Sequence, residues 1–170
     1  MPLRTLYLVS SRNSPGQRAH FSFFVPSAAF PNIGTSIHVV GAPMMGYELE
    51  FKRNHNSSSN EEPYEMVSIG QVDCHHIADS SGDRNMLVDH TPRDNLEVAA
   101  SQVPPPRISE NFMAPVNDTI NRRCQEWTME YVHHLIARGL LGEEAIQIVQ
   151  SKRDLPAHGI GLQPVARRLD

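Results

Sequence analysis

The pattern of apolar residues divides the chain into two halves with different predicted secondary structure. In the first half, runs rich in β-branched and aromatic residues alternate with turns that contain Pro, Gly, Asn or Ser, as is typical of strands. These runs cover residues 3–10, 18–26, 35–41, 47–52 and 64–74. The run 47–52 alternates apolar with charged residues, so one of its faces is expected to be in water. Connections of hairpin length between the runs favour antiparallel pairing.

The second half follows helical periodicity. Asp94 and Glu97 have the spacing of an N-cap and a glutamate that reaches back to it, so a short helix is predicted near 95–102. The main helix is expected over 120–138, and a second one opens at 142–145 with acidic residues that suit a helix N-terminus. Spacings of three and four residues give the main helix one mostly apolar face. That face comprises Cys124, Trp127, Thr128, Tyr131, Leu135 and Ile136.

Together these patterns predict an α+β fold. We expect an antiparallel β-sheet of about five strands, packed against the C-terminal helix that carries the cysteine. A length of 170 residues is natural for one domain, which we place at 1–155. Residues 156–170 contain proline and glycine without periodicity and predict an extended C-terminal tail.

Charge and hydropathy argue against several classes of partner. The formal net charge is −4 and no basic patch is present, so no nucleic-acid partner is expected. No apolar run approaches membrane-spanning length, and the first residues lack the pattern of a signal peptide. We therefore expect a cytoplasmic protein without a membrane partner, whose two cysteines are reduced rather than bridged. No dinucleotide or phosphate-binding fingerprint indicates a cofactor.

One cysteine and two distant histidines have the residue types and placement that thiol chemistry requires. Cys124 lies near the start of the main helix, while His20 and His38 lie on consecutive predicted strands. A helix N-terminus and a neighbouring imidazole both favour the thiolate, so a lowered thiol pKa is expected. One imidazole could contact the thiol while the other orients it, as in nucleophile–base–orienter catalysis. The backbone amide of Cys124 could stabilise an oxyanion.

Two other interpretations of these residues stay open. A buried cysteine is often an inert apolar side chain, and a strand histidine is often structural. The protein would then be a non-catalytic module that binds a small apolar metabolite or a protein partner. Separately, Cys74, His75 and His76, with Asp73 and Asp79, could ligate a metal. Adjacent histidines on a strand point to opposite faces, however, so no metal site is predicted there.

The order of these residues resembles that in circularly permuted papain-like proteins of the NlpC/P60-like group, which includes lecithin retinol acyltransferase. The resemblance rests on the run from His20 to Val25, on Ile37-His38-Val39-Val40, and on a late cysteine that opens a helix. It implies that His20 is the base, that His38 polarises it, and that Cys124 is the nucleophile. The chain also resembles a family of small uncharacterised fungal proteins with a Cys-Gln-x-Trp helix.

Departures from the acyltransferase pattern limit what the resemblance implies about substrate. Arg123 stands where the acyltransferases have asparagine, and Gln125-Glu126-Trp127 replaces their Glu-His-Phe. We therefore expect a thiol-dependent enzyme that acts on an ester, thioester or amide of a small molecule through a Cys-His acyl-enzyme. Hydrolase, acyltransferase and cyclase activities all remain compatible with that intermediate. Near the expected nucleophile and base, Trp127, Gln125 and Phe21 are predicted to contact the substrate.

Overall fold

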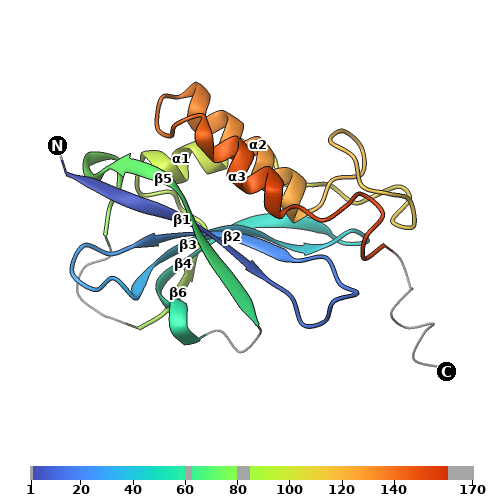
Figure 1. Cartoon of the computed structure of the whole chain (residues 1–170), viewed down its shortest axis with the longest axis horizontal. Helices are drawn as coiled ribbons and strands as arrows, with labels where there is room; N and C mark the ends of the chain where they lie inside the picture. Colours follow the sequence, from blue (N-terminus) through green and yellow to red (C-terminus); the bar gives the residue numbers. More distant parts are fainter. Residues whose placement is uncertain (1, 60–62, 80–84, 161–170) are drawn as a thin grey trace.

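A computed structural model describes residues 2–59, 63–79 and 85–160. It has the predicted α+β architecture: an antiparallel sheet with three α-helices, which cover one face of the sheet (Figure 1). The strand order is β5-β1-β2-β3-β4-β6. Within the described residues the sheet has six strands rather than about five, because a short strand precedes the first helix. The strands are β1 (Leu3–Ser11), β2 (His20–Pro26), β3 (Ile33–Ala42), β4 (Gly46–Asn56), β5 (Tyr64–Asp73) and β6 (Leu87–Asp89).

The additional strand β6 is joined to the edge of the sheet by a buried arginine. Arg53 on β4 is 1% exposed and donates to Glu97 Oε1 at 2.8 Å and to Asp89 Oδ2 at 3.1 Å. Glu97 lies on helix α1 (Asn95–Ser101), so one guanidinium connects β4, β6 and α1. A buried charge of this kind requires paired carboxylates, and both are supplied from outside the β4 strand itself.

The alternation of side chains along the strands gives the sheet two different faces. One face carries buried apolar residues such as Phe21, Phe23 and Ile37 and packs against Trp127 and Tyr131 of helix α2 (Cys124–Ala137). The opposite face carries polar side chains, among them those of His20 and His38. The core thus lies between the sheet and the helices, while the histidines project from the other side of the sheet.

Between β2 and β3 the sheet opens at the start of β2. Their pairing runs from Phe23↔Ile37 to Pro26↔Gly34. Beyond this stretch, residues 20–22 of β2 pair with β1, and residues 38–40 of β3 pair with β4. The two strands therefore diverge where His20 and His38 lie, and the N-terminus of α2 enters this divergence. This opening lets a residue from the helical layer approach side chains of the opposite face.

The helix α2 begins later than its periodicity predicts, at Cys124 rather than near residue 120. Asn117 Oδ1 accepts hydrogen bonds from the backbone N–H groups of Thr119, Ile120 and Asn121. This turn competes with helical hydrogen bonding, so helix formation starts only after it. Glu126 then accepts the backbone N–H of Arg123 at 2.9 Å and caps the helix start. The delayed start places Cys124 at the first helical position.

Helix α3 (Glu144–Lys152) packs beside α2 and completes the helical layer (Figure 1). The chain after it was predicted to be an extended tail from residue 156. Residues 156–159 form a turn instead, and Arg18 donates to the carbonyls of Leu155 and His158. Ile160 is 8% exposed, so this segment packs against the domain. Residues 161–170 of the predicted tail lie outside the described residues.

Candidate active site

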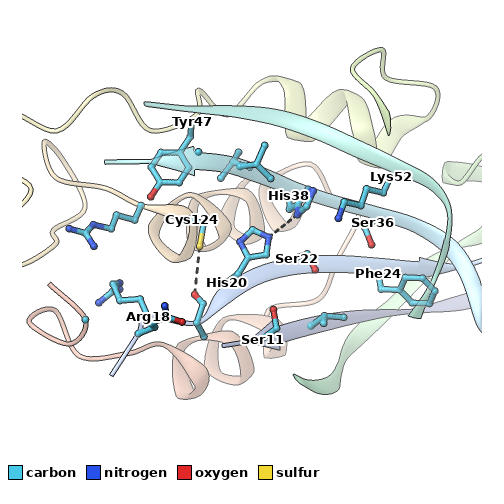
Figure 2. Close-up of a pocket in the computed structure, with 18 of the residues that line it drawn as sticks. Ser11, Arg18, His20, Ser22, Phe24, Ser36, His38, Tyr47, Lys52 and Cys124 are labelled. Carbon is cyan, nitrogen blue, oxygen red and sulfur yellow. Dashed lines mark hydrogen bonds between the residues drawn. The ribbon is translucent and has the colours of Figure 1, made fainter. Parts of the chain in front are cut away.

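A cavity of about 1020 Å³ lies at the divergence of β2 and β3. Cys124, His20 and His38 all line it, so the fold brings together the three residues that the sequence analysis singled out (Figure 2). The polar face of the sheet forms most of the remaining wall. Other lining residues include Ser11, Arg18, Ser22, Phe24, Ser36, Tyr47, Lys52, His55, Ser57 and Arg123.

The Cys124 thiol lies against the backbone of strand β2 on both sides of His20. Its Sγ is 3.7 Å from the carbonyl oxygen of Ala19, to which the thiol donates. The backbone N–H groups of Phe21 and Gln125 hydrogen-bond to the sulfur and act to lower its pKa. These contacts fix the sulfur in the opening between the strands. Only rotation about the Cβ–Sγ bond is then needed to turn the thiol proton from the carbonyl toward the cavity.

Burial overturns the lowered thiol pKa that the sequence predicts. Loss of water raises the pKa of the Cys124 thiol to about 11, and the nearby Glu126 carboxylate adds to this effect. The hydrogen bonds from Phe21 and Gln125 and the positive charge of Arg18 oppose the shift but are outweighed. At neutral pH the sulfur is therefore a neutral thiol. The Gln125 backbone N–H at the helix start acts to lower the thiol pKa, as predicted, but loss of water around the sulfur has the larger effect.

The two histidines form a directed hydrogen-bond chain with a glutamate. His20 Nε2 lies 2.8 Å from His38 Nδ1, and His38 Nε2 lies 2.9 Å from Glu50 Oε2. An ionised carboxylate can only accept, so His38 carries its proton on Nε2 and accepts at Nδ1. His20 must then donate from Nε2, which leaves its Nδ1 with a free lone pair. The carboxylate of Glu50 thus sets the tautomer of both rings.

The tautomer of His20 makes its free nitrogen suitable to accept a proton. Within the described residues, no hydrogen bond occupies His20 Nδ1. In Figure 2 the His20 ring lies between the Cys124 sulfur and His38, with Nε2 directed to His38. Burial, His38 and Lys52 lower the pKa of His20 to about 3, and burial, Lys52 and His55 lower the pKa of His38 to about 3. Both imidazoles are therefore neutral at neutral pH.

Glu50 is a site residue that sequence reasoning missed. It pairs directly with His38 across β3 and β4 and its side chain is 13% exposed. The alternation of 47–52 correctly places Glu48, Glu50 and Lys52 on one face. That face was expected to be in water, but Glu50 instead pairs with His38 and Lys52 lines the cavity. The sequence did contain a signal for this residue. Glu50 is a carboxylate on the strand after the one that carries His38, and the even numbers of the alternating pattern place it on the same face.

Two residues beside the thiol were also missed, Tyr47 and Arg123. Tyr47 lines the cavity, and burial together with the nearby Cys124 sulfur raises the pKa of its phenol. Its hydroxyl therefore stays protonated and can donate. Arg123 donates from Nη2 to the carbonyl of Phe112 at 2.9 Å, while its buried Nε has no protein partner. Both side chains interact electrostatically with the Cys124 sulfur, so they lie beside the point where an oxyanion would form.

The three residues predicted to contact substrate are placed elsewhere. Trp127 and Phe21 belong to the apolar core, and Trp127 Nε1 donates to the carbonyl of Val103. Gln125 is fully buried and donates to Ala19 O at 3.0 Å and to Asp154 Oδ2 at 2.8 Å. None of the three lines the cavity. Their contacts hold α2 and the start of β2 together, so we assign them a supporting rather than a substrate-binding position.

The residues considered for a metal site satisfy one another instead. His75 Nδ1 lies 2.8 Å from Asp73 Oδ1, and His76 Nδ1 lies 2.7 Å from Asn95 Nδ2. Cys74 accepts from Arg4 at 3.8 Å. Across the described part of the chain, no three His, Cys, Asp or Glu side chains converge in a way that could hold an ion. In the same residues, every helix is too short or too polar to cross a bilayer.

The fold and the cavity define an α+β domain with a Cys-His-His-Glu cluster at the N-terminus of its main helix. Residues 6–142 match the family DUF6540, described as a family of unknown function. This range covers most of the chain, so the protein belongs to that family, and all four members of the cluster lie within it. No curated protein and no solved structure matches the chain.

Proposed function

We propose that the protein is a thiol-dependent enzyme with a papain-like arrangement of nucleophile and base. It acts on an ester, thioester or amide of a small molecule through an acyl-enzyme on Cys124. The observation that carries this proposal is the chain Glu50–His38–His20, which ends at the cavity and leaves His20 Nδ1 with a free lone pair; Figure 2 shows the His20 ring between the Cys124 sulfur and His38.

In the proposed first step, Cys124 Sγ attacks the substrate carbonyl carbon and its proton passes to His20 Nδ1. The carbonyl π electrons move onto oxygen, where the Cys124 backbone N–H, Tyr47 and Arg123 provide donors. The new imidazolium is stabilised through His38 by Glu50. Collapse of the intermediate expels the leaving group, which takes the proton from His20. Water, an amine or an internal nucleophile then releases the acyl group and restores the thiol.

The neutral resting state makes this general-base catalysis rather than attack by a preformed thiolate. With the thiol pKa raised and the imidazole pKa lowered, the proton remains on sulfur until the substrate carbonyl is in place. Proton transfer then accompanies formation of the S–C bond, as it does for an activated serine. The same raised thiol pKa, together with the hydrogen bond from the thiol to Ala19 O, also favours a second candidate function. This candidate is a binding module in which Cys124 is only packed.

Glu50→Gln distinguishes the two candidates. An amide can donate as well as accept, so it no longer forces the proton of His38 onto Nε2, and His20 Nδ1 loses its assured lone pair. For any thioester that the wild-type protein turns over, we expect kcat to fall about 10- to 100-fold with little change in KM. The assay is steady-state turnover of a panel of thioesters, esters and amides.

Glu48→Gln is the matched control, since Glu48 lies on the same strand and face but its side chain is 70% exposed. It should leave kcat unchanged. If Glu50→Gln and Glu48→Gln behave alike, the hydrogen-bond chain has no part in turnover. Absence of turnover across the whole panel, combined with ligand affinity that survives loss of Cys124, would favour the binding module.

A further inference from the structure

The cavity has a charge opposite to that of the protein as a whole. The chain carries a formal net charge of −4. The described residues that line the cavity nevertheless include Arg18, Lys52 and Arg123 and no aspartate or glutamate. A cavity lined by cations concentrates anions relative to the surrounding solvent. The substrate that enters it is therefore expected to carry negative charge.

The three cations are not equally available to a ligand. Arg18 is committed to Glu126, at 3.2 Å, and to the carbonyls of Leu155 and His158. Arg123 donates to Phe112 O and lies in the field of Glu126. Among the described residues, no carboxylate forms an ion pair with Lys52. Lys52 is therefore the cavity cation that no carboxylate of residues 2–59, 63–79 and 85–160 pairs with.

The surroundings of Lys52 suit a small carboxylate. Ser36 lies directly opposite Lys52 on β3, and Phe24 lies opposite Ser36 on β2, where Ser22 shares its face. Hydroxyl donors and an apolar ring therefore line the cavity on the strands beside Lys52. Figure 2 shows Lys52 on the far side of the histidine pair from Cys124. The electrostatic influence of Lys52 on both His20 and His38 is consistent with this position beside them. One ammonium with hydroxyl donors matches a monoanion, whereas phosphate recognition usually relies on arginine forks or clustered backbone N–H groups.

We propose that Lys52, with Ser22 and Ser36, forms a carboxylate-binding subsite, and that the substrate is an acyl compound with a second, anionic end. The monothioester or monoester of a dicarboxylic acid is the class that fits. Its reactive carbonyl meets Cys124 while its free carboxylate binds Lys52, and the cavity spans both. The substrate assignment rests on the proposed function, but the carboxylate subsite does not.

The test measures binding separately from turnover. Hexanoate and hexanamide have the same chain and differ in charge, so calorimetric titration of each into the Cys124→Ala protein isolates the contribution of the carboxylate. We expect hexanoate to bind about tenfold more tightly than hexanamide. Lys52→Met should remove this difference, Lys52→Arg should keep it, and Lys152→Met should not affect it. Lys152 is the other lysine of the chain and pairs with Glu65 on the surface. Thermal unfolding verifies that each variant is folded.

Several results would overturn the subsite. These are equal affinity for the two probes, no saturable binding of hexanoate, or a preference that survives Lys52→Met but disappears in Arg123→Met. Tighter binding of hexyl phosphate than of hexanoate would replace the carboxylate by a phosphate. Turnover of adipoyl and hexanoyl thioesters by the wild-type protein then tests the substrate class. Charge-selective binding without any turnover would refute the enzyme but keep the subsite. Turnover without preference for the adipoyl thioester would keep the enzyme but refute the proposed substrate class.

Discussion

Replacing Cys124 by alanine is expected to abolish turnover of every thioester, ester or amide that the wild-type protein processes. The loss should be about a thousandfold or more in kcat, because alanine removes the nucleophile and the acyl-enzyme can no longer form. Affinity for substrate should change little, since the sulfur is one small part of a wall that contains many other side chains. Steady-state kinetics with the best substrate of the panel measures both quantities.

Cys74→Ala provides the matched control for this prediction. Cys74 is the second cysteine of the chain, lies in a short 3-10 turn after β5 and does not line the cavity. It should therefore retain wild-type kcat. Equal loss in both variants would indicate a general effect of removing a thiol, and undiminished turnover by Cys124→Ala would remove the cysteine from the mechanism.

The resting Cys124 thiol is expected to resist alkylation at neutral pH. A thiol with a pKa of about 11 is ionised to roughly one part in ten thousand at pH 7, against about 3% for a free cysteine of pKa about 8.5. Iodoacetamide reacts with the thiolate, so labelling should be about 100-fold slower or more than for a cysteine peptide. The folded-state pKa is raised, so the rate should rise about tenfold per pH unit and level off only near pH 11.

Mass spectrometry of Cys124-containing peptides after timed labelling gives this rate separately from that of Cys74. Measurements stay below the pH at which circular dichroism reports unfolding. A labelling rate that is already maximal at pH 7 would mean a preformed thiolate, and the general-base mechanism would then be wrong. The same pH profile of labelling also tests one aspect of the resemblance to papain-like proteins. It shows whether Cys124 and His20 form a thiolate–imidazolium pair in the resting protein.

Periodicity was sufficient to predict the architecture. Alternation located five strands, and the spacing of Trp127 and Tyr131 identified the helix face that packs on the sheet. β6 was missed because three residues are too few for an alternation signal, and its position depends on a distant side chain, Arg53. The late start of α2 depends on Asn117, whose side-chain hydrogen bonds compete with helix formation independently of the apolar pattern.

The candidate site was only partly predictable. Cys124, His20 and His38 were identified by residue type and order, and the fold brings them to one cavity. Glu50 and Lys52 were assigned to a face in water, because alternation determines which residues share a face but not what covers that face. The pKa of the thiol was predicted in the wrong direction for a related reason. The helix terminus is visible in the sequence, whereas the burial that outweighs it depends on packing between distant segments.

The central claim is that Cys124 becomes acylated with His20 as its base, and trapping the acyl-enzyme tests it most directly. The protein is mixed with an activated thioester at neutral pH, quenched in acid and analysed by intact mass and peptide mapping. The account predicts one acyl group on Cys124 in the wild-type protein and in His133→Ala, whose histidine is exposed on α2, and a rate at least about a hundredfold lower in His20→Ala. Acylation that is equally fast without His20, or that occurs on Cys74 instead, would contradict it.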